Sequence, residues 1–404
     1  MDYGVLIEGD NRRAGVCHRI RCCGGAVGAD PRHFGLSMFN SSSSVPIDRV
    51  TVASYTIPTD APESDGTLEW TRTTIVIATV SAGGENGMGY TYADSTTGAL
   101  IHAVLRGVVK GMDAMAPPAA YMAMWQKIRN LGRPGICSMA ISAVDSAIWD
   151  VKARLLGVPL VTLLGQVRTG AEVYGSGGFT SYSDQRLAEQ LGGWARQGMS
   201  AVKMKIGRDP QRDPTRVRVA REAIGAETEL YVDANGAYTP RQALKVAEML
   251  RGFDVRWFEE PVSSDNLYGL KFVRERAGGK MEIAAGEYCY DIFDFKSMLA
   301  AAAVDVLQAD LTRCGGVTAF MEVAALCQAY NVPLSSHTAP ALHAHAACAA
   351  VPFTTMEYFH DHARIEQMLF DGLPRLVKGE LCPDLSRPGN GLELRRADAE
   401  KFAA

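Results

Sequence analysis

The sequence predicts an α/β protein in which a closed parallel barrel follows a smaller α+β domain. The main observation is a repeat of short apolar strands and amphipathic helices after residue 165, at intervals of roughly 25 residues. A second observation is that strands precede helices between residues 46 and 165, the order of an α+β domain. A third is the tail after Asp371, where several prolines and glycines predict extended segments that return to the first domain.

Eight strands are expected in the barrel. They are residues 173–175, 201–205, 230–233, 256–259, 283–286, 306–308, 333–335 and 355–357. Helices are expected between them, for example over 184–197, 240–251 and 316–330. A doubly wound open sheet is the alternative fold. Because no Gly-x-Gly-x-x-Gly follows a strand, the dinucleotide-binding version of that fold is weakened.

The first domain is expected to begin with two β-rich strands, 50–55 and 73–80. The residues between them, 58–70, carry proline, aspartate and glycine and predict a mobile loop. A turn is expected over 84–92. Three helices should follow, over 97–112, 119–130 and 135–156.

Residues 1–45 show neither a helical nor a strand period. They predict a disordered tail, or an extension upstream of the true start with Met38 as the alternative start. Cys17, Cys22 and Cys23 have no matching second pair, which disfavours a metal knuckle. The expected division of the chain is an extension (1–45), a capping domain (46–165), a barrel (166–370) and C-terminal segments (371–404).

Composition excludes several classes of function. The net charge of −4 does not favour binding to nucleic acid or to an anionic membrane surface. No apolar run approaches about 18 residues, so no membrane span is expected, and the N-terminus lacks a segment of the signal-peptide type. The nine scattered cysteines are typical of reduced thiols. We therefore expect a cytoplasmic protein. Its expected partners are a small-molecule carboxylate substrate and further copies of the same chain in a homo-oligomer.

Two lysines, Lys203 and Lys205, alternate along the strand expected at 201–205. Residues i and i+2 of a strand point to the same face, so the two ammonium groups should lie together. Their repulsion would lower the pKa of at least one of them and allow it to act as a general base. The alternative is an edge strand that carries two solvated lysines.

Three acids stand where successive barrel strands end, namely Asp233, Glu259 and Glu287. All strand C-termini of a parallel barrel open onto one face, which holds the active site. Three converging carboxylates repel one another, and an all-oxygen set of this kind suits Mg²⁺. The alternative is that each acid caps a helix. Glu260 is a rival for Glu259, but its side chain should point the other way.

The next two strands end in Asp310 and His337. Neighbouring strand ends could place the carboxylate against the imidazole, which would orient the ring and raise its basicity. Glu357 ends the last strand and is another candidate for this rim. A lysine on one side, a histidine on the other and a metal between them suit removal of a proton next to a carboxylate, with the positive charges stabilising the enediolate.

These motifs together resemble the mandelate racemase subgroup of the enolase superfamily. They are Lys203-x-Lys205, Asp233-x-Asn235, Glu259-Glu260-Pro261, Gly286-Glu287, Asp310 with Gly315-Gly316, and Ser336-His337. The resemblance covers about residues 46–400 and implies a modified (β/α)₇β barrel with an α+β capping domain completed by C-terminal segments. Such sites use a Lys or His base with Mg²⁺.

Roles follow from the resemblance, position by position. Lys205 resembles the base on one face and Lys203 its partner towards the substrate carboxylate. Asp233, Glu259 and Glu287 resemble the Mg²⁺ ligands. His337, paired with Asp310, resembles the acid/base of the other face. Glu357 resembles the acid that contacts the substrate carboxylate, and Asn235 a contact to its hydroxyl.

The same two bases support two reactions. Dehydration of an acid sugar, an aldonate or aldarate, to a 2-keto-3-deoxy acid is preferred, and racemisation of a 2-hydroxy acid such as mandelate is the alternative. A third hypothesis is a non-catalytic barrel that binds metal or ligand. Substrate choice should depend on the capping loops, in which Trp70, Tyr90 and Tyr92 could stack on a ring or bond a polyol. Structural or rim roles are favoured for four other histidines, His343, His345, His360 and His362.

Overall fold

The computed structural model describes residues 44–404. The expected tail and the cysteines Cys17, Cys22 and Cys23 lie outside the described residues, apart from positions 44 and 45. Within the described residues no helix combines the length and apolar character needed to cross a membrane.

The first domain contains a three-stranded antiparallel sheet, β1 (Ile47–Ser64), β2 (Glu69–Ala82) and β3 (Glu85–Tyr92), in that order. The strands are rich in Val, Ile and Thr, which favour a pleated, half-buried surface.

The mobile loop expected over 58–70 is wrong. The β1–β2 ladder runs on from Pro58 to Ser64, with one irregularity between Pro58 and Glu63. A bulge absorbs the proline and polar residues that suggested a loop. Only 65–68 turn, and Asp65 Oδ1 accepts bonds from two backbone N–H groups there.

Helices cover one side of this sheet. They are α1 (Thr96–Leu100), η1 (Ile101–Leu105), α2 (Arg106–Val109), α3 (Pro117–Lys127), η2 (Ile128–Asn130), α4 (Ile136–Leu155) and α5 (Leu160–Leu164). The long helix α4 packs against β3, where the chain has Gly87 and Gly89. A Cβ at Gly87 would stand 2.2 Å from the Ala147 carbonyl oxygen, so only glycine permits this approach.

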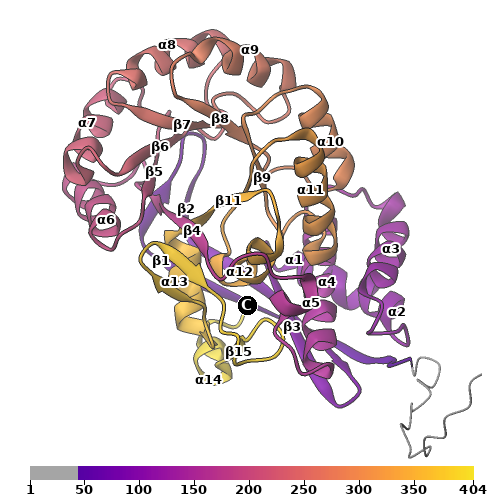
Figure 1. The fold of residues 1–404 in the computed structure, drawn as a ribbon. Coiled ribbons are helices and arrows are strands. Elements are labelled where there is room, and N and C mark those ends of the chain that lie inside the picture. The colour runs from indigo at the N-terminus through magenta and orange to yellow at the C-terminus, as the bar shows by residue number, and fades with distance from the viewer. Residues whose placement is uncertain (1–43) are drawn as a thin grey trace, which may run out of the picture. The chain divides into compact units, whose positions relative to one another are not determined.

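Eight parallel strands close into a barrel (Figure 1). They are β4 (Ala171–Gly177), β5 (Ala201–Lys205), β6 (Glu229–Asp233), β7 (Val255–Glu259), β8 (Glu282–Ala285), β9 (Val306–Ala309), β10 (Leu334–Ser336) and β11 (Phe353–Phe359). The ladder between β11 and β4 closes the ring. Every expected strand overlaps an observed one, and the closed barrel with an antiparallel domain before it confirms the predicted fold class.

Seven helices connect consecutive barrel strands, which makes a (β/α)₇β barrel. They are α6 (Asp184–Arg196), α7 (Asp213–Ile224), α8 (Pro240–Arg251), α9 (Leu267–Ala277), α10 (Ile292–Ala300), α11 (Gly316–Tyr330) and α12 (Pro340–Ala349). Local sequence explains their starts. Thr239 and Gln242 form a capping box before α8, and Asp291 caps α10.

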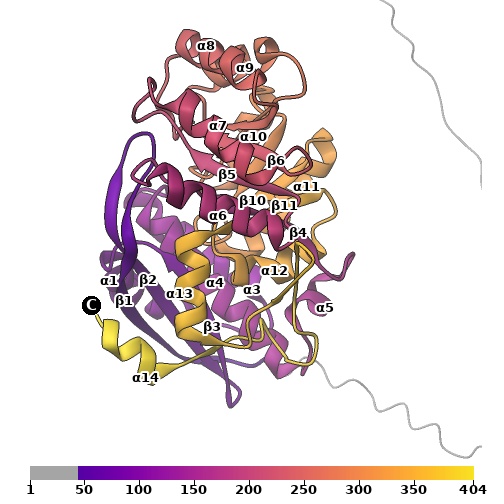
Figure 2. The ribbon, with the colours of Figure 1, turned by 90° about the vertical axis from the view of Figure 1, so that its left-hand side faces the viewer.

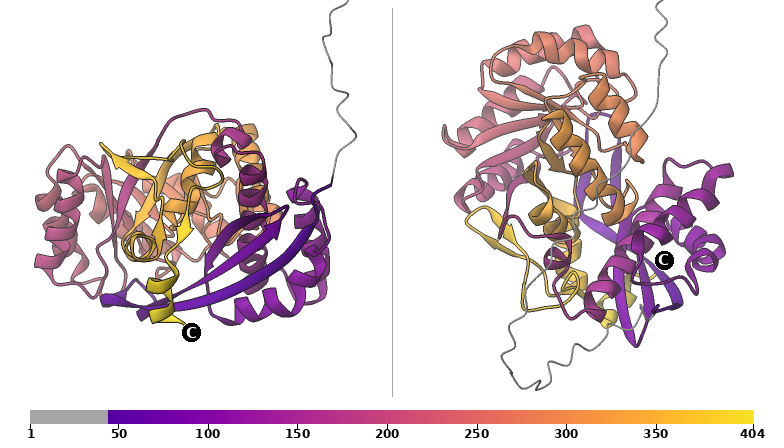
Figure 3. Two further views of the ribbon diagram at one scale, coloured as in Figure 1. Left: turned by 90° about the horizontal axis from the view of Figure 1, so that it is seen from below. Right: turned by 45° about the vertical axis from the view of Figure 1, so that its right-hand side comes forward.

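The C-terminal segments contact both parts of the chain. They are α13 (His360–Leu369), β12 (Phe370–Asp371), β13 (Arg375–Val377), β14 (Glu380–Cys382), β15 (Glu393–Leu394), α14 (Arg396–Ala399) and η3 (Glu400–Phe402). Asn390 bonds to Asp150 of α4 and to Met88 of β3. Figure 3 shows these segments beside the strands of the first domain, and Ala403 bridges to Tyr55.

The β1–β2 hairpin extends from the first domain along the barrel, past β5 and α6 (Figure 2). Near its tip the backbone oxygen of Asp65 accepts a bond from Thr180, which follows β4. Glu69 pairs with Arg208, which follows β5. The hairpin therefore forms a wall beside the C-terminal ends of the barrel strands.

Candidate active site

A cavity of about 420 Å³ lies at the C-terminal ends of the barrel strands. Its barrel wall includes Lys205, Asn235, Glu287, Arg313 and His337. The first domain contributes the opposite wall, which includes Asp65, Leu68, Trp70, Arg72, Thr73, Thr74, Tyr92 and Asp94. Lys205 of β5 and His337, which follows β10, therefore line the same cavity.

Both lysines of β5 are buried and paired with carboxylates. Lys203 Nζ lies 2.5 Å from Glu259 Oε1 and 2.8 Å from Glu357 Oε1. Lys205 Nζ lies 2.5 Å from Asp233 Oδ2. Lys203 is fully buried beneath the cavity, whereas Lys205 reaches the cavity wall.

The expectation that repulsion lowers a lysine pKa is wrong for this structure. Burial acts to lower the pKa of Lys203, but the carboxylates of Glu259, Glu357 and Asp233 outweigh it and raise the pKa. Burial and the neighbouring Lys203 act to lower the pKa of Lys205, but the carboxylates of Asp233, Glu259 and Glu287 together outweigh them and raise it. The acids on the adjacent strands decide the direction of both pKa shifts, and the pattern of the lysine strand by itself does not contain them.

The three strand-end acids converge. Asp233, Glu259 and Glu287 are all buried, and each offers a carboxylate oxygen within 4.8 Å of the others. Glu287 Oε2 is buried and has no hydrogen-bond partner, although His337 Nε2 lies 3.3 Å away. Burial and then Asp233 raise the pKa of Glu259 well above its usual range. Together with Glu357 the acids outnumber the two lysines, so this all-oxygen set fits a divalent cation such as Mg²⁺.

Glu260, the next residue along the chain after Glu259, is not one of the three converging acids. It lines a second cavity of about 610 Å³, which adjoins the first because Asn235 and Tyr288 line both. Its Oε1 is buried without a partner, and burial together with Glu287 raises its pKa.

The imidazole of His337 is bound to the carboxylate of Asp310. Nδ1 lies 2.7 Å from Asp310 Oδ2, and Asp310 Oδ1 accepts bonds from the backbone and hydroxyl of Thr312. Burial acts to raise the pKa of Asp310, but the bond to His337 and the charge of Arg313 hold it well below its usual range. Asp310 therefore stays ionised and directs Nε2 of the ring towards Glu287 and the cavity.

Arg313 was missed by sequence reasoning. Its guanidinium lies 3.5 Å from Asp310 Oδ2 and 3.6 Å from Glu287 Oε1, and it lines the cavity. The sequence did contain a sign of this role, because Arg313 follows Asp310 by three residues in the turn after β9. Arg313 therefore links Glu287 of the carboxylate triad to Asp310, the hydrogen-bond partner of His337.

Glu357 does not line the cavity, whereas Asn235 does. Both oxygens of Glu357 are taken, Oε1 by Lys203 and Ser176 and Oε2 by the N–H of Thr338. Burial acts to raise the pKa of Glu357, but Lys203, His337 and Lys205 together outweigh it and hold the group ionised. Asn235 reaches the cavity, and its Oδ1 is buried without a partner.

Tyr90 is not a substrate contact in this structure. It is fully buried, its hydroxyl donates to Glu366 Oε1 at 2.6 Å, and its ring stacks on Phe370. Tyr92, two residues further along β3, does line the cavity and stacks on His362. Both tyrosines share one face of the strand, and α13 covers Tyr90 but leaves Tyr92 at the edge of the cavity.

The four histidines for which structural or rim roles were expected also differ in their surroundings. His343 and His345 are buried and bonded to backbone groups, His343 Nε2 to the N–H of Leu311 and His345 Nδ1 to that of Val161. His362 is buried at the cavity wall. His360 instead bonds to Asp60 on the β1–β2 hairpin.

Backbone strain gathers at this face of the barrel. Asn235, Glu260 and Thr338 have φ angles of 45°, 36° and 49°, and each follows the C-terminus of a barrel strand. Non-glycine residues rarely adopt this left-handed region, and such residues cluster at functional sites.

Comparison with known proteins identifies the class. Residues 186–399 match the family model described as enolase C-terminal domain-like, and residues 50–165 match that of the mandelate racemase / muconate lactonizing enzyme N-terminal domain. The chain is therefore an enzyme of the enolase superfamily. Within that superfamily it belongs to the mandelate racemase subgroup.

Two curated relatives of this chain are named for different reactions. The chain is 34% identical over 361 residues to a 3,6-anhydro-alpha-L-galactonate cycloisomerase of Streptomyces coelicolor, a match that covers 86% of this chain and 97% of that one. It is 28% identical over 295 residues to the L-talarate/galactarate dehydratase of Salmonella typhimurium, with 72% and 74% covered.

Two solved structures share the fold over their whole length. A mandelate racemase/muconate lactonizing enzyme-like protein from Rubrobacter xylanophilus is 51% identical, with a TM-score of 0.87 over 89% of this chain and 100% of that one. A racemase from Streptomyces coelicolor, solved with bound magnesium, is 31% identical, with a TM-score of 0.83 and the same coverage. Magnesium is the cofactor of this chemistry, and the buried carboxylate triad fits it.

Proposed function

We propose that this enzyme removes the α-proton of an acid sugar, an aldonate or aldarate, and then expels the β-hydroxyl to give a 2-keto-3-deoxy acid. The single observation that carries the proposal is that Lys205 of β5 and His337, which follows β10, line one cavity beside the carboxylate triad. Two acid/base groups on separate sides of one space suit a reaction that takes a proton and also delivers one.

Asp233, Glu259 and Glu287 would hold Mg²⁺, which supplies positive charge next to the substrate carboxylate and lowers the cost of the enediolate. Lys203 and Arg313 add fixed positive charge around the same acids. Their ion pairs are already formed before substrate binds, so no reorganisation is needed as negative charge develops.

The proposed steps balance as follows. His337, or Lys205 in its unprotonated form, takes the proton from C2, and the C–H electron pair forms the C1–C2 double bond of the enediolate. That pair then forms a C2–C3 double bond as the C3–OH bond breaks. The imidazolium of His337 gives its proton to the departing hydroxyl; that proton is the one taken from C2 when His337 is the base, and one taken from solvent beforehand when Lys205 is the base. Water leaves, and the enol becomes the 2-keto-3-deoxy acid. Asp310 holds the ring in one orientation throughout.

The lining of the cavity favours a polyol over an aromatic ring. Asp65, Arg72, Thr73, Thr74 and Asp94 all face the space from the first domain. Asn235 Oδ1 is a buried acceptor without a partner and would bind a substrate hydroxyl. Racemisation of a 2-hydroxy acid such as mandelate is the alternative, since the same two groups could remove and return a proton.

Ring opening is a second candidate, which the 34% identical cycloisomerase supports. In a 3,6-anhydro acid sugar the oxygen on C3 belongs to a ring ether. The same α-proton abstraction would then break the C3–O bond without loss of water. Hydroxyl and ether leaving groups require the same residues here, so the substrate alone separates the two reactions.

One screen tests these proposals. A library of acid sugars and anhydro acid sugars is incubated with the enzyme and Mg²⁺, and 2-keto products are detected with semicarbazide. We expect a 2-keto product from at least one acid sugar. A negative screen, combined with α-proton exchange into deuterated water on a 2-hydroxy acid, would instead establish the racemase.

Variants test whether the barrel is catalytic at all. Lys205→Ala should abolish product formation while Mg²⁺ still binds. If Lys205→Ala leaves every activity unchanged while Mg²⁺ binding is retained, the enzymatic assignment of this site fails and a ligand-binding barrel is favoured.

A further inference from the structure

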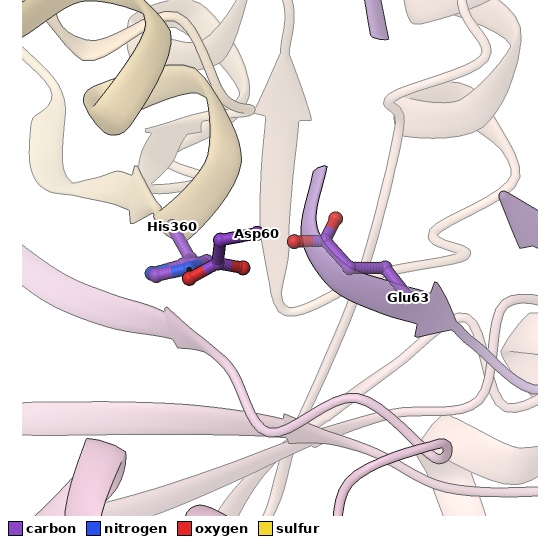
Figure 4. A group of neighbouring side chains, drawn as sticks. All are labelled: Asp60, Glu63 and His360. Atoms are coloured by element: carbon purple, nitrogen blue, oxygen red, sulfur yellow. Dashed lines mark hydrogen bonds and ion pairs between the residues drawn. The ribbon is translucent and has the colours of Figure 1, made fainter. Parts of the chain in front are cut away.

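A second cluster of metal-ligating side chains lies outside the cavity, between the β1–β2 hairpin and the start of α13 (Figure 4). It consists of Asp60 and Glu63 of β1 and His360, the first residue of α13. Each offers one ligand atom, and these atoms all lie within 4.8 Å of one another. His360 Nε2 and Asp60 Oδ2 are 3.1 Å apart.

A strand irregularity brings the two acids together. Pro58 pairs with Arg72 and Glu63 pairs with Trp70, so the four residues 59–62 stand opposite the single Thr71. In a regular strand residues i and i+3 point to opposite faces. The bulge overrides this alternation and lets Asp60 and Glu63 approach one another, and bulges of this kind are frequent next to functional sites.

Glu63 is the feature that points to a ligand. Its side chain is fully buried, Oε2 accepts a bond from Trp70 Nε1 at 2.9 Å, and Oε1 is buried with no hydrogen-bond partner. Among the described residues no lysine or arginine forms an ion pair with it. In Figure 4 its carboxylate is directed towards Asp60.

The surroundings make an uncompensated carboxylate costly. Trp70 packs against Phe179, which in turn contacts Tyr182 and Phe359. Burial, followed by the charge of Asp361, raises the pKa of Glu63 to about 8. A buried carboxyl stays protonated unless it pairs with an opposite charge or coordinates a metal, and the described residues provide no ion pair for Glu63.

We propose that Asp60, Glu63 and His360 form a binding site for one divalent transition-metal ion of the Zn²⁺ type, separate from the Mg²⁺ triad. Imidazole nitrogen and carboxylate oxygen are both ligands of Zn²⁺, and three protein ligands leave one position open to water. The all-oxygen triad lacks an imidazole and suits Mg²⁺. The proposal does not depend on which reaction the enzyme performs.

Such an ion would join two parts of the described chain. Asp60 and Glu63 belong to the hairpin of the first domain, and His360 immediately follows β11 of the barrel. Asp60 Oδ1 would keep its bond to Arg186 because only Oδ2 faces His360. Glu63 holds Trp70, which lines the cavity, so the ion would also fix that part of the cavity wall.

Zn²⁺ titration of matched variants tests the site. Glu287→Gln serves as the background, with excess Mg²⁺ present, so that the triad does not count as a Zn²⁺ site. We expect Glu287→Gln/His360→Asn to bind one Zn²⁺ per chain fewer than Glu287→Gln by calorimetry and elemental analysis. Glu287→Gln/His102→Asn, which changes an exposed histidine, should bind the same number. The nine cysteines are common to all variants and cancel in the difference.

Glu63→Gln in the same background is the second variant. Gln keeps the volume and can still accept the bond from Trp70, so it should fold and should also lose one Zn²⁺ per chain. Zn²⁺ should raise the melting temperature of the background protein and not that of either variant. Equal Zn²⁺ stoichiometry in the background, His360→Asn and Glu63→Gln proteins would overturn the proposal, as would a loss of one Zn²⁺ in the His102→Asn control.

Discussion

The imidazole of His337 and the carboxylate of Asp310 are joined by a 2.7 Å hydrogen bond between neighbouring strand ends, although the residues stand 27 positions apart in the chain. The same carboxylate also lies 3.5 Å from Arg313. The ring is therefore fixed at Nδ1, and only Nε2 faces the cavity. This relationship makes His337 the better supported of the two candidates for delivering a proton to a leaving group.

His337→Asn should lower kcat by about 10²–10⁴-fold, the usual contribution of a general acid/base. Asp310→Asn should lower kcat less, because the ring stays in place but loses the group that fixes its tautomer. Steady-state kinetics on the substrate found by the screen measures both. His102→Asn is the control, and equal kcat values for His337→Asn and this control would contradict the assigned role.

Glu287→Gln should weaken Mg²⁺ binding at least tenfold, because it removes one charged oxygen from the triad. Glu260→Gln should change the Mg²⁺ affinity by less than about threefold, since Glu260 points into the other cavity. Calorimetric titration with Mg²⁺ after treatment with a chelator compares the two. If Glu260→Gln has the larger effect, the ligand set assigned here is wrong.

Lys203→Ala should destabilise the metal-free protein by about 3–5 kcal/mol, because it leaves Glu259 and Glu357 buried without their cation. Mg²⁺ should restore part of this loss, since it supplies charge to the same cluster. The free energy of unfolding in denaturant, measured with and without Mg²⁺, checks both statements. An equal loss under the two conditions would show that Lys203 does not share its carboxylates with the metal.

Tyr90→Phe should leave KM within about twofold of the parent but lower the free energy of unfolding by roughly 1–3 kcal/mol, because Glu366 loses a buried donor. Tyr92→Phe should instead raise KM and leave the free energy of unfolding nearly unchanged. The reason is that Tyr92 lines the cavity and its hydroxyl makes only a long hydrogen bond of 3.4 Å. Kinetics and denaturation of the two variants together test the correction made for Tyr90. A raised KM for Tyr90→Phe with unchanged stability would reinstate it as a substrate contact.

Glu366 should make stability depend on pH. Burial raises its pKa to about 8 despite bonds from Tyr90 and the N–H of Ala341. A carboxyl whose pKa is raised on folding favours the folded state below its unfolded pKa of about 4.5. That contribution is lost as the pH rises to about 8.

Glu366→Gln removes this titration. The difference in unfolding free energy between Glu366→Gln and the parent should therefore increase in favour of the variant between pH 5 and about pH 8, by a few kcal/mol at most. Urea denaturation across this range provides the measurement. A difference that does not change with pH would show that the group does not titrate there.

Much of the barrel could be predicted from local pattern. The strand that contains Lys203 and Lys205 was predicted with its observed bounds, as was helix α8 (Pro240–Arg251). Short apolar runs between amphipathic helices identify parallel strands without knowledge of their partners. The hairpin was not predictable in this way, because the bulge at 59–62 hides a strand inside a polar stretch that contains proline.

The sequence alone therefore determined which residues stand at the C-terminal ends of the strands, because that position depends only on where each apolar run stops. The tertiary structure decided the charge state of those residues and which side chains surround them. The pKa of Lys205 follows from Asp233 on the next strand, and the burial of Tyr90 from Glu366, 276 residues away. Electrostatic and packing energies depend on distances in space. These distances join residues that are far apart in the sequence, so they are known only once the barrel has folded.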